Sequence, residues 1–220
     1  MDNKKRLRIF CDFDGTIAKR DVGNLVFAHF GSESRWWRLV GLWRQGRLEG
    51  REMWRRQAES MRLTEAELDA FVRPLVIDAT FASLVAYSRE RHFPLAVVSD
   101  GMDAYIARIL AAHGFYGIPL RTNRMILEPE GRVRLEFPWY GLGCGQCANC
   151  KGLHVRSERR PGETTVYIGD GRSDICGARE ADIVFAKKEL LAWCRETGRP
   201  HYAFTSFADV LAQLQRDETE

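Results

Sequence analysis

Residues 11–16, CDFDGT, place two carboxylates two residues apart, directly after a short apolar run. That run is residues 7–11, LRIFC, and it lies between charged residues and Gly15, as a buried strand of a parallel sheet would. Carboxylates at such a position are costly to bury unless they are paired, hydrogen-bonded or bound to a metal. Asp12 and Asp14 therefore either cap the backbone of a strand-to-turn connection or belong to a functional site.

The composition predicts a folded chain with a large core. Its 220 residues are enough for one large domain, or for one domain with an insert. Hydrophobic residues make up 45% of the chain, so extended disorder is not expected. The 33 basic and 30 acidic residues leave a net charge of only +3, which argues against nucleic acid as the main partner.

The apolar segments are all short. The run of about five apolar-rich residues before Asp12 is too brief for the core of a signal peptide, and no other run approaches the length of a membrane span. We therefore expect a cytoplasmic protein with no membrane partner, whose thiols are reduced.

From about residue 78 onward, helical patterns alternate with short apolar strands. The predicted strands are residues 94–98, 165–168 and 183–185. Strands that alternate with helices indicate βαβ units, so the predicted fold class is α/β with a doubly wound parallel sheet. Residues 121–137 are predicted to form a hairpin that turns at Glu130 and Gly131.

Residues 22–75 show helical periodicity instead. Apolar side chains recur on one helix face at Trp36, Leu39, Val40 and Trp43. An Arg- and Trp-rich segment can bind nucleic acid, but tryptophans on an apolar helix face favour core packing with solvated arginines. Residues 64–67, TEAE, match a capping box that starts a further helix. We therefore predict a core made of residues 1–21 and 76–220, with a helical domain of residues 22–75 inserted after the first strand.

Three of the predicted strands end in polar turns that contain glycine. In an open α/β sheet, ligands bind at the carboxyl ends of the strands. If these strands are neighbours, four carboxylates converge there: Asp12, Asp14, Asp170 and Asp174. Such a group needs a counter-charge, and oxygen ligands favour Mg²⁺. Ser99, just before a predicted helix, adds a hydroxyl and backbone amides that suit a phosphoryl group.

The order of these motifs resembles the haloacid dehalogenase superfamily over the whole chain. The motifs are DFDGT at residues 12–16, Ser99 at the end of a strand, Lys151 at the start of a helix, and GDGRSD at residues 169–174. This resemblance implies a Rossmann-like core. The insert after the first motif is similar to the helical cap of the phosphoserine-phosphatase-like branch.

A cysteine-rich loop indicates which phosphatase families of this superfamily the chain resembles. Residues 144–151, CGQCANCK, end in Cys-Lys, as in the 2-hydroxy-3-keto-5-methylthiopentenyl-1-phosphate phosphatases of methionine salvage. The related phosphocholine and phosphoethanolamine phosphatases carry a similar loop. Residues 99–103, SDGMD, also resemble the salvage group.

The resemblance implies a role for each motif residue. Asp12 would be the nucleophile that forms an aspartyl-phosphate, and Asp14 would protonate the leaving oxygen and then activate water. Mg²⁺ would be held by the Asp12 carboxylate, the Asp14 backbone carbonyl and Asp170. The phosphate would be bound by Ser99, Asp100, Gly101 and Lys151, with Asp174 and Thr16 in support. Asp21 either contacts the head group of the substrate or caps the next helix.

Cys144, Cys147 and Cys150 have the two-residue spacing of zinc ligands, and His154 follows on the predicted helix. Two interpretations stay open: a structural Zn²⁺ site made of these four side chains, or a reduced and tightly packed loop, in which a disulfide forms only on oxidation. The remaining cysteines lie in apolar contexts and are predicted to pack in the core: Cys11, Cys176 and Cys194.

The sequence thus predicts a Mg²⁺-dependent phosphomonoesterase that acts on a small phosphorylated metabolite, as a monomer or homodimer. The methionine-salvage enol phosphate is the first substrate hypothesis, and phosphoserine, phosphocholine and phosphoethanolamine are alternatives. A phosphotransferase would use the same aspartyl-phosphate. A hypothesis from another class is a zinc-dependent binding module, in which Asp12 has no role.

Overall fold

The structure, a computed structural model, describes residues 6–217. In this part of the chain, seven strands form one sheet in the order β4-β3-β2-β1-β5-β6-β7. Their bounds are β1 Arg6–Cys11, β2 Leu95–Met102, β3 Leu120–Leu127, β4 Val133–Glu136, β5 Glu163–Gly169, β6 Ile183–Ala186 and β7 Tyr202–Ala203. All neighbouring strands are parallel except β3 and β4. The predicted fold class, a doubly wound α/β sheet, is confirmed. The two-residue β7 was not predicted, because two residues are too few to show a strand pattern.

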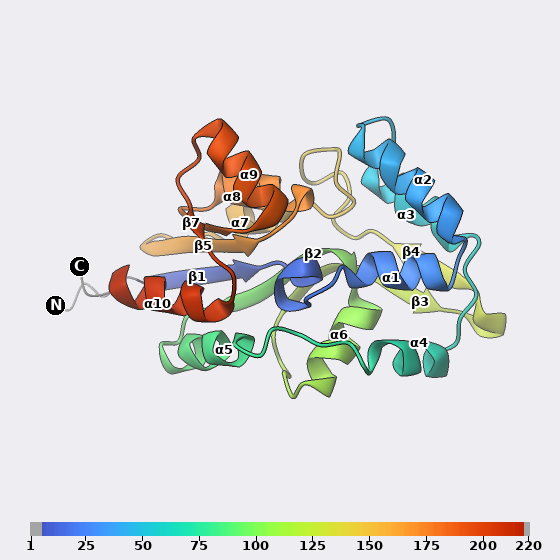
Figure 1. The fold of residues 1–220 in the computed structure, drawn as a ribbon, viewed down its shortest axis with the longest axis horizontal. Coiled ribbons are helices and arrows are strands. Elements are labelled where there is room, and N and C mark those ends of the chain that lie inside the picture. The colour runs from blue at the N-terminus through green and yellow to red at the C-terminus, as the bar shows by residue number, and fades with distance from the viewer. Residues whose placement is uncertain (1–5, 218–220) are drawn as a thin grey trace.

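Helices cover both faces of the sheet (Figure 1). Their bounds are α1 Val22–His29, α2 Glu33–Arg44, α3 Gly50–Ala58, α4 Glu65–Val72, α5 Phe81–Glu90, α6 Asp103–Ala112, α7 Lys151–Glu158, α8 Ile175–Glu180, α9 Lys188–Thr197 and α10 Phe207–Asp217. Helices α5, α6 and α10 lie on one side of the sheet, and α7, α8 and α9 lie on the other. None of the helices within residues 6–217 combines the length and the apolar character that crossing a membrane requires.

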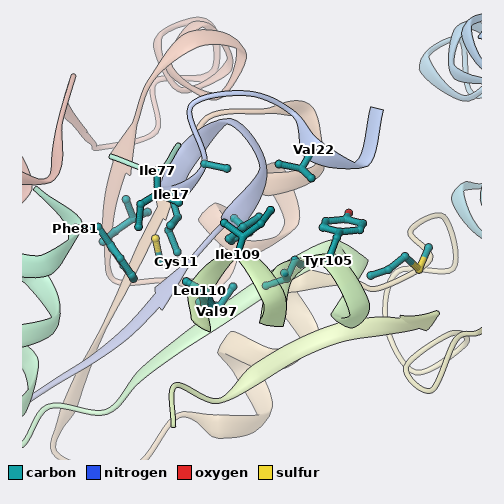
Figure 2. Packing of buried hydrophobic residues seen from close by; sticks show 14 of the residues in the cluster. Cys11, Ile17, Val22, Ile77, Phe81, Val97, Tyr105, Ile109 and Leu110 are labelled. Carbon is teal, nitrogen blue, oxygen red and sulfur yellow. The ribbon is translucent and has the colours of Figure 1, made fainter. Parts of the chain in front are cut away.

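Strand β1 shows why the sheet is covered on both sides. Its successive side chains alternate between two hydrophobic clusters: Ile9 belongs to the cluster that contains Ile109 of α6, and Phe10 to the cluster that contains Tyr167 and Ala178. Figure 2 shows the first of these clusters around Ile109. Because both faces are buried near the carboxyl end of β1, residues 9–11 form a continuous apolar run, whereas Arg6 and Arg8 alternate with Leu7 at the start of the strand.

The segment 22–75 contains helices α1 to α4. Trp36 is only 1% exposed, and its ring packs 5.5 Å from Phe27 and 5.0 Å from Trp54. The interpretation as a core residue is therefore confirmed for Trp36, whereas Trp43 is only half-buried. The capping box at the start of α4 is also present, because Thr64 and Glu67 exchange hydrogen bonds.

The predicted hairpin is formed by β3 and β4. Glu130 and Gly131 make its turn with φ angles of 63° and 72°, in the left-handed region that favours glycine at the second position. The turn lies against the helical segment, since the Leu63 N–H donates to the Gly131 carbonyl at 2.9 Å. The hairpin thus connects the sheet to α1–α4.

Candidate active site

The carboxyl ends of β2, β1 and β5 lie side by side. Strand β1 lies between β2 and β5, so the chain leaves β1 toward one side of the sheet and later returns on its other side. Such a switch point leaves a crevice at the strand ends. The structure has a cavity of about 230 Å³ at this place, lined by Asp12 and Asp170, which directly follow β1 and β5, and by Ser99, which lies in the second half of β2. The predicted convergence of these side chains is therefore found.

A buried ion triad lies at the floor of the cavity. Lys151, the first residue of α7, donates to Asp12 Oδ1 at 2.6 Å and to Asp174 Oδ1 at 2.5 Å. The three side chains are 4% exposed or less. Burial alone favours the neutral amine, but the charges of Asp12 and Asp174 raise the pKa of Lys151 above its ordinary value. Lys151 is thus a fixed positive charge next to Asp12.

Asp14 lies beside this triad with its own set of donors. Its Oδ1 accepts the Val22 N–H at 2.8 Å, at the start of α1, and its Oδ2 lies within reach of the Ser99 hydroxyl at 3.3 Å and the Tyr105 hydroxyl at 3.4 Å. Burial, and next the charge of Asp21, raises the pKa of Asp14 to about 7. A carboxyl with this pKa can both give and accept a proton near neutral pH.

Asp170 is bound by Thr16 and by a lysine that lies outside the motifs. The Thr16 hydroxyl donates to Asp170 Oδ1 at 3.3 Å, and Lys188 donates to Asp170 Oδ2 at 2.8 Å. Lys188 follows the last motif in the chain, so the motif order favours Lys151 over it. Lys188 reaches the site because it follows β6, which pairs with β5, and parallel strands end at the same edge. Gly15 has a φ of 75°, and a Cβ there would lie 2.3 Å from Asp170 Oδ2, so only glycine fits this turn.

The donor set fits a hard divalent cation. Oxygens of Asp12, Asp170 and Asp174 all lie within 4.8 Å of one another, and all three residues are buried. Carboxylate oxygens are the ligands that Mg²⁺ prefers in proteins. The Asp14 carboxylate is not part of this group.

Asp21 caps α1, since its Oδ1 accepts the Asn24 N–H at 2.8 Å and its Oδ2 accepts the Asn24 side-chain amide at 2.7 Å. Asp21 and Asn24 also line the cavity. The two interpretations of Asp21, a helix cap and a residue at the head-group end of the site, are therefore compatible.

Asn149 connects the cysteine-rich loop to the strand ends, a role that no sequence motif indicates. Its N–H donates to Asp100 Oδ1 at 2.6 Å, and its side-chain amide donates to the Ser99 and Arg121 carbonyls at 2.8 Å each. Burial raises the pKa of Asp100 to about 6, against the hydrogen bond from Asn149. The Ser99 hydroxyl accepts the Gly101 N–H at 2.9 Å. Asn149 thus fixes the loop two residues before Lys151.

The structure does not bring His154 together with the cysteine thiols, so it does not support the interpretation in which His154 is a zinc ligand. Its Nε2 lies 2.7 Å from Asn149 Oδ1, and its ring packs edge-on against Trp139 at 4.8 Å. Helix α7 begins at Lys151, so Cys150 is the N-cap. His154 is held by Asn149 and Trp139 and is not part of the group of sulfur ligands.

The prediction for Cys176 is wrong, whereas Cys11 and Cys194 are fully buried core residues as expected. Cys176 is only half-buried, and its Sγ lies within 4.8 Å of those of Cys144 and Cys150. Its neighbours in sequence form an apolar helical pattern, but α8 turns this side chain toward the cysteine-rich loop.

The opposite wall of the cavity comes from α2 and α3 and is mostly apolar. It is made by Trp36, Val40, Trp43, Met53 and Trp54. At its rim, the Arg44 guanidinium of α2 forms an ion pair with Glu189 of α9. The cavity is therefore charged on the side of the strand ends and apolar on the side of the inserted helices.

Fold and site together define an α/β enzyme whose polar centre lies at the switch point of a parallel sheet. The family model of haloacid dehalogenase-like hydrolases matches residues 9–179, and the chain belongs to this family.

Individual proteins similar to this chain over most of its length are phosphatases as well. A 2-hydroxy-3-keto-5-methylthiopentenyl-1-phosphate phosphatase of Geobacillus kaustophilus is 31% identical, over 97% of this chain and 98% of that protein. The polyol phosphate phosphatase PYP1 of Saccharomyces cerevisiae is 26% identical, over 94% and 92%. A structure of a phospho-aspartyl intermediate analogue of phosphoserine phosphatase has the same fold, with a TM-score of 0.72 at 20% identity, over 96% of this chain and 99% of that one. The chain is a phosphatase, and the resemblance indicated by its motifs is confirmed.

Proposed function

We propose that the chain is a Mg²⁺-dependent phosphomonoesterase that acts through an aspartyl-phosphate on Asp12, with 2-hydroxy-3-keto-5-methylthiopentenyl-1-phosphate as its substrate. The observation that carries the proposal is the buried Asp12–Lys151–Asp174 triad at the floor of a small cavity whose opposite wall is apolar. A triad of this kind positions a carboxylate nucleophile beside a positive charge that can stabilise a phosphoryl group.

In the first step, a carboxylate oxygen of Asp12 attacks the phosphorus and the ester P–O bond breaks. Asp14 gives its proton to the leaving oxygen, a role that suits a carboxyl with a pKa of about 7. In the second step, Asp14 takes a proton from water, which attacks the phosphorus and releases phosphate from Asp12. Lys151 and Ser99 offset the charge on the phosphoryl oxygens in both steps.

Asp12, the Asp14 backbone carbonyl and Asp170 would hold Mg²⁺. When bound, the ion would neutralise the negative charge of the phosphoryl oxygens and of the carboxylates around them. Asp174 orients Lys151 through the hydrogen bond at 2.5 Å, and Thr16 orients Asp170.

We further propose that residues 22–75 form a cap that closes over the substrate. Closure would exclude bulk water from the aspartyl-phosphate. The Arg44–Glu189 ion pair joins α2 of the inserted segment to α9 of the sheet region, and it supports this role. The cavity volume of about 230 Å³ suits a small metabolite better than a phosphorylated residue of a protein substrate.

The substrate hypothesis depends on the apolar wall. A methylthio tail is apolar and makes favourable sulfur–aromatic contacts, which Trp36, Trp43 and Trp54 can supply. The name of the Geobacillus kaustophilus relative supports the same choice. A second candidate is phosphocholine, because three tryptophans together with Asp21 can also surround a quaternary ammonium group.

Phosphate release from a panel of phosphomonoesters tests the function. We expect the methylthio enol phosphate to give the highest kcat/KM, ahead of phosphocholine, phosphoethanolamine, phosphoserine and a polyol phosphate. Release should stop when Mg²⁺ is chelated with EDTA and return when Mg²⁺ is added in excess. Preference for phosphocholine would favour the second candidate, and no release from any member with Mg²⁺ present would refute the phosphomonoesterase proposal.

Truncation of one tryptophan tests the apolar wall. Trp43→Ala should raise KM for the methylthio substrate about tenfold, equivalent to about 1.4 kcal/mol, through loss of aromatic and apolar contact with the tail. The KM for acetyl phosphate, which has no such tail, should change little. Trp37→Ala is the matched control, because Trp37 lies on the same helix but is 49% exposed and does not line the cavity. Equal effects of the two substitutions would contradict this placement of the tail.

A further inference from the structure

Four cysteine thiols gather beside the active site, in a place that the proposed reaction does not use. Cys144, Cys147 and Cys150 belong to the loop before α7, and Cys176 belongs to α8. The Sγ atoms of Cys144 and Cys147 are 3.5 Å apart, and those of Cys144, Cys150 and Cys176 all lie within 4.8 Å of one another. The Cys147 thiol also interacts with those of Cys150 and Cys176.

We propose that these four thiolates bind one structural Zn²⁺ ion. With Zn–S bonds of about 2.3 Å, the sulfurs of a tetrahedral site lie about 3.8 Å apart. The Cys144–Cys147 pair, at 3.5 Å, is close to this spacing, and Cys144, Cys150 and Cys176 lie within 4.8 Å of one another. Four soft sulfur ligands select Zn²⁺ over the hard Mg²⁺ of the active site. Binding converts four thiols to thiolates and releases four protons, and no oxidant or reductant takes part.

The arrangement favours a metal over a disulfide. A disulfide joins two sulfurs, whereas here each of the four thiols has more than one other thiol as a neighbour. Cys150 is also the N-cap of α7, so a thiolate at this position lies near the positive end of the α7 dipole. This end of the helix partly offsets the negative charge of a tetrathiolate site.

The zinc site would hold the Asp12–Lys151–Asp174 triad in place without being part of it. Cys150 directly precedes Lys151, and Cys176 follows Asp174 by two residues, so one ion would join the two chain segments that carry the 2.5 Å Lys151–Asp174 contact. These segments already pack closely, since a Cβ on Gly152 would lie 2.5 Å from the Cys176 carbonyl oxygen. We infer that zinc holds Lys151 in place without touching the substrate.

The same loop also contacts the inserted helices. The Gly50 N–H donates to the Gln146 carbonyl at 3.1 Å, and the Tyr140 hydroxyl donates to Glu49 Oε2 at 2.6 Å. In Figure 1 the loop lies between α8 and the α2–α3 pair. A zinc-bound loop would therefore hold both the Asp12–Lys151–Asp174 triad and the N-terminus of α3 in place.

Metal analysis of the purified protein tests the proposal. We expect one zinc ion per wild-type chain by mass spectrometry of metals, retained through dialysis against buffer. Replacing zinc by Co²⁺ should give the charge-transfer band and the visible bands of a tetrahedral tetrathiolate site. This spectrum is read on the wild type and needs no activity. A wild-type chain with reduced thiols that retains no zinc and gives no cobalt–thiolate band would overturn the proposal.

Substitutions identify the fourth ligand. Cys176→Ser should lose the zinc or weaken its binding at least tenfold, and its cobalt spectrum should shift to that of three thiolates. Two variants serve as controls and should keep one tightly bound ion: His154→Gln, and Cys194→Ala in the core. Loss of zinc from His154→Gln with retention in Cys176→Ser would refute the tetrathiolate assignment. If Cys176→Ser does not fold, the intensity of the wild-type cobalt band still counts the thiolates.

The outcome is independent of the proposed phosphatase reaction. Phosphate release measured on the same wild-type sample reports on Asp12 and Mg²⁺, whereas zinc content and the cobalt spectrum report on the thiols. An active enzyme without zinc would refute the zinc site alone, and a zinc-loaded protein without activity would refute the proposed function alone.

Discussion

Asp12→Asn should lower kcat for phosphate release by at least about 10⁴-fold, a loss typical of removing a catalytic nucleophile. The asparagine amide has almost the same shape as the carboxylate, and its oxygen can still accept the hydrogen bond that Lys151 donates at 2.6 Å. It cannot attack phosphorus as a carboxylate does. The effect should therefore fall on kcat, with substrate affinity largely kept. Steady-state phosphate release with excess Mg²⁺ measures it.

Asp69→Asn is the matched control for this substitution. Asp69 is an exposed carboxylate that pairs with Arg108 at 2.6 Å on the surface of α4 and does not line the cavity. We expect unchanged kcat. If Asp12→Asn kept a tenth or more of wild-type kcat, Asp12 would not be the nucleophile.

Lys151→Met should unfold at a markedly lower temperature and should also be inactive. Methionine fills much of the same volume but leaves the buried carboxylates of Asp12 and Asp174 without their shared counter-charge. Removing one partner from a buried ion pair costs about 3–5 kcal/mol. For a chain of this size, that corresponds to a fall in Tm of roughly 6–20 °C, as measured by thermal unfolding. Added Mg²⁺ should restore part of the loss, because it supplies positive charge to the same carboxylates.

Lys188→Met is the control that separates the effect of burying an ion pair from the effect of removing a positive charge. Lys188 also pairs with a site carboxylate, Asp170, at 2.8 Å, but its side chain is 55% exposed. Because solvent screens an exposed ion pair, this variant should lose at most about 1 kcal/mol. Equal stability of the two methionine variants would contradict the role of Lys151 as the buried counter-charge.

The strand ends of the site were predictable from the sequence. In the sequence, the apolar runs of β1, β2 and β5 are followed by acidic or hydroxyl residues, and parallel strands end at a common edge, although β2 itself continues past Ser99 to Met102. The amino-acid pattern alone is therefore enough to place Asp12, Ser99 and Asp170 together. Lys151 could be chosen because it opens the helix that precedes β5.

The remaining contacts depend on how helices pack, which no local pattern encodes. Cys176 joins the thiol cluster because α8 packs against α7, and Lys188 reaches Asp170 because β6 pairs with β5. Asn149 binds two backbone carbonyls of separate strands, and its neighbours in sequence give no hint of them. His154 contacts Asn149 and Trp139, and neither contact can be read from the four-residue spacing to Cys150.

Acid quenching during turnover tests the aspartyl-phosphate most directly. Asp14→Asn should slow hydrolysis of the intermediate, while p-nitrophenyl phosphate, whose leaving group needs no proton, still phosphorylates the enzyme. We predict that this variant, mixed with Mg²⁺ and radiolabelled p-nitrophenyl phosphate and quenched in acid, carries one phosphate per chain on the peptide that contains Asp12, and releases it in base. Turnover by the wild type with no phosphate on this peptide in either protein, or with phosphate on another residue, would contradict the mechanism.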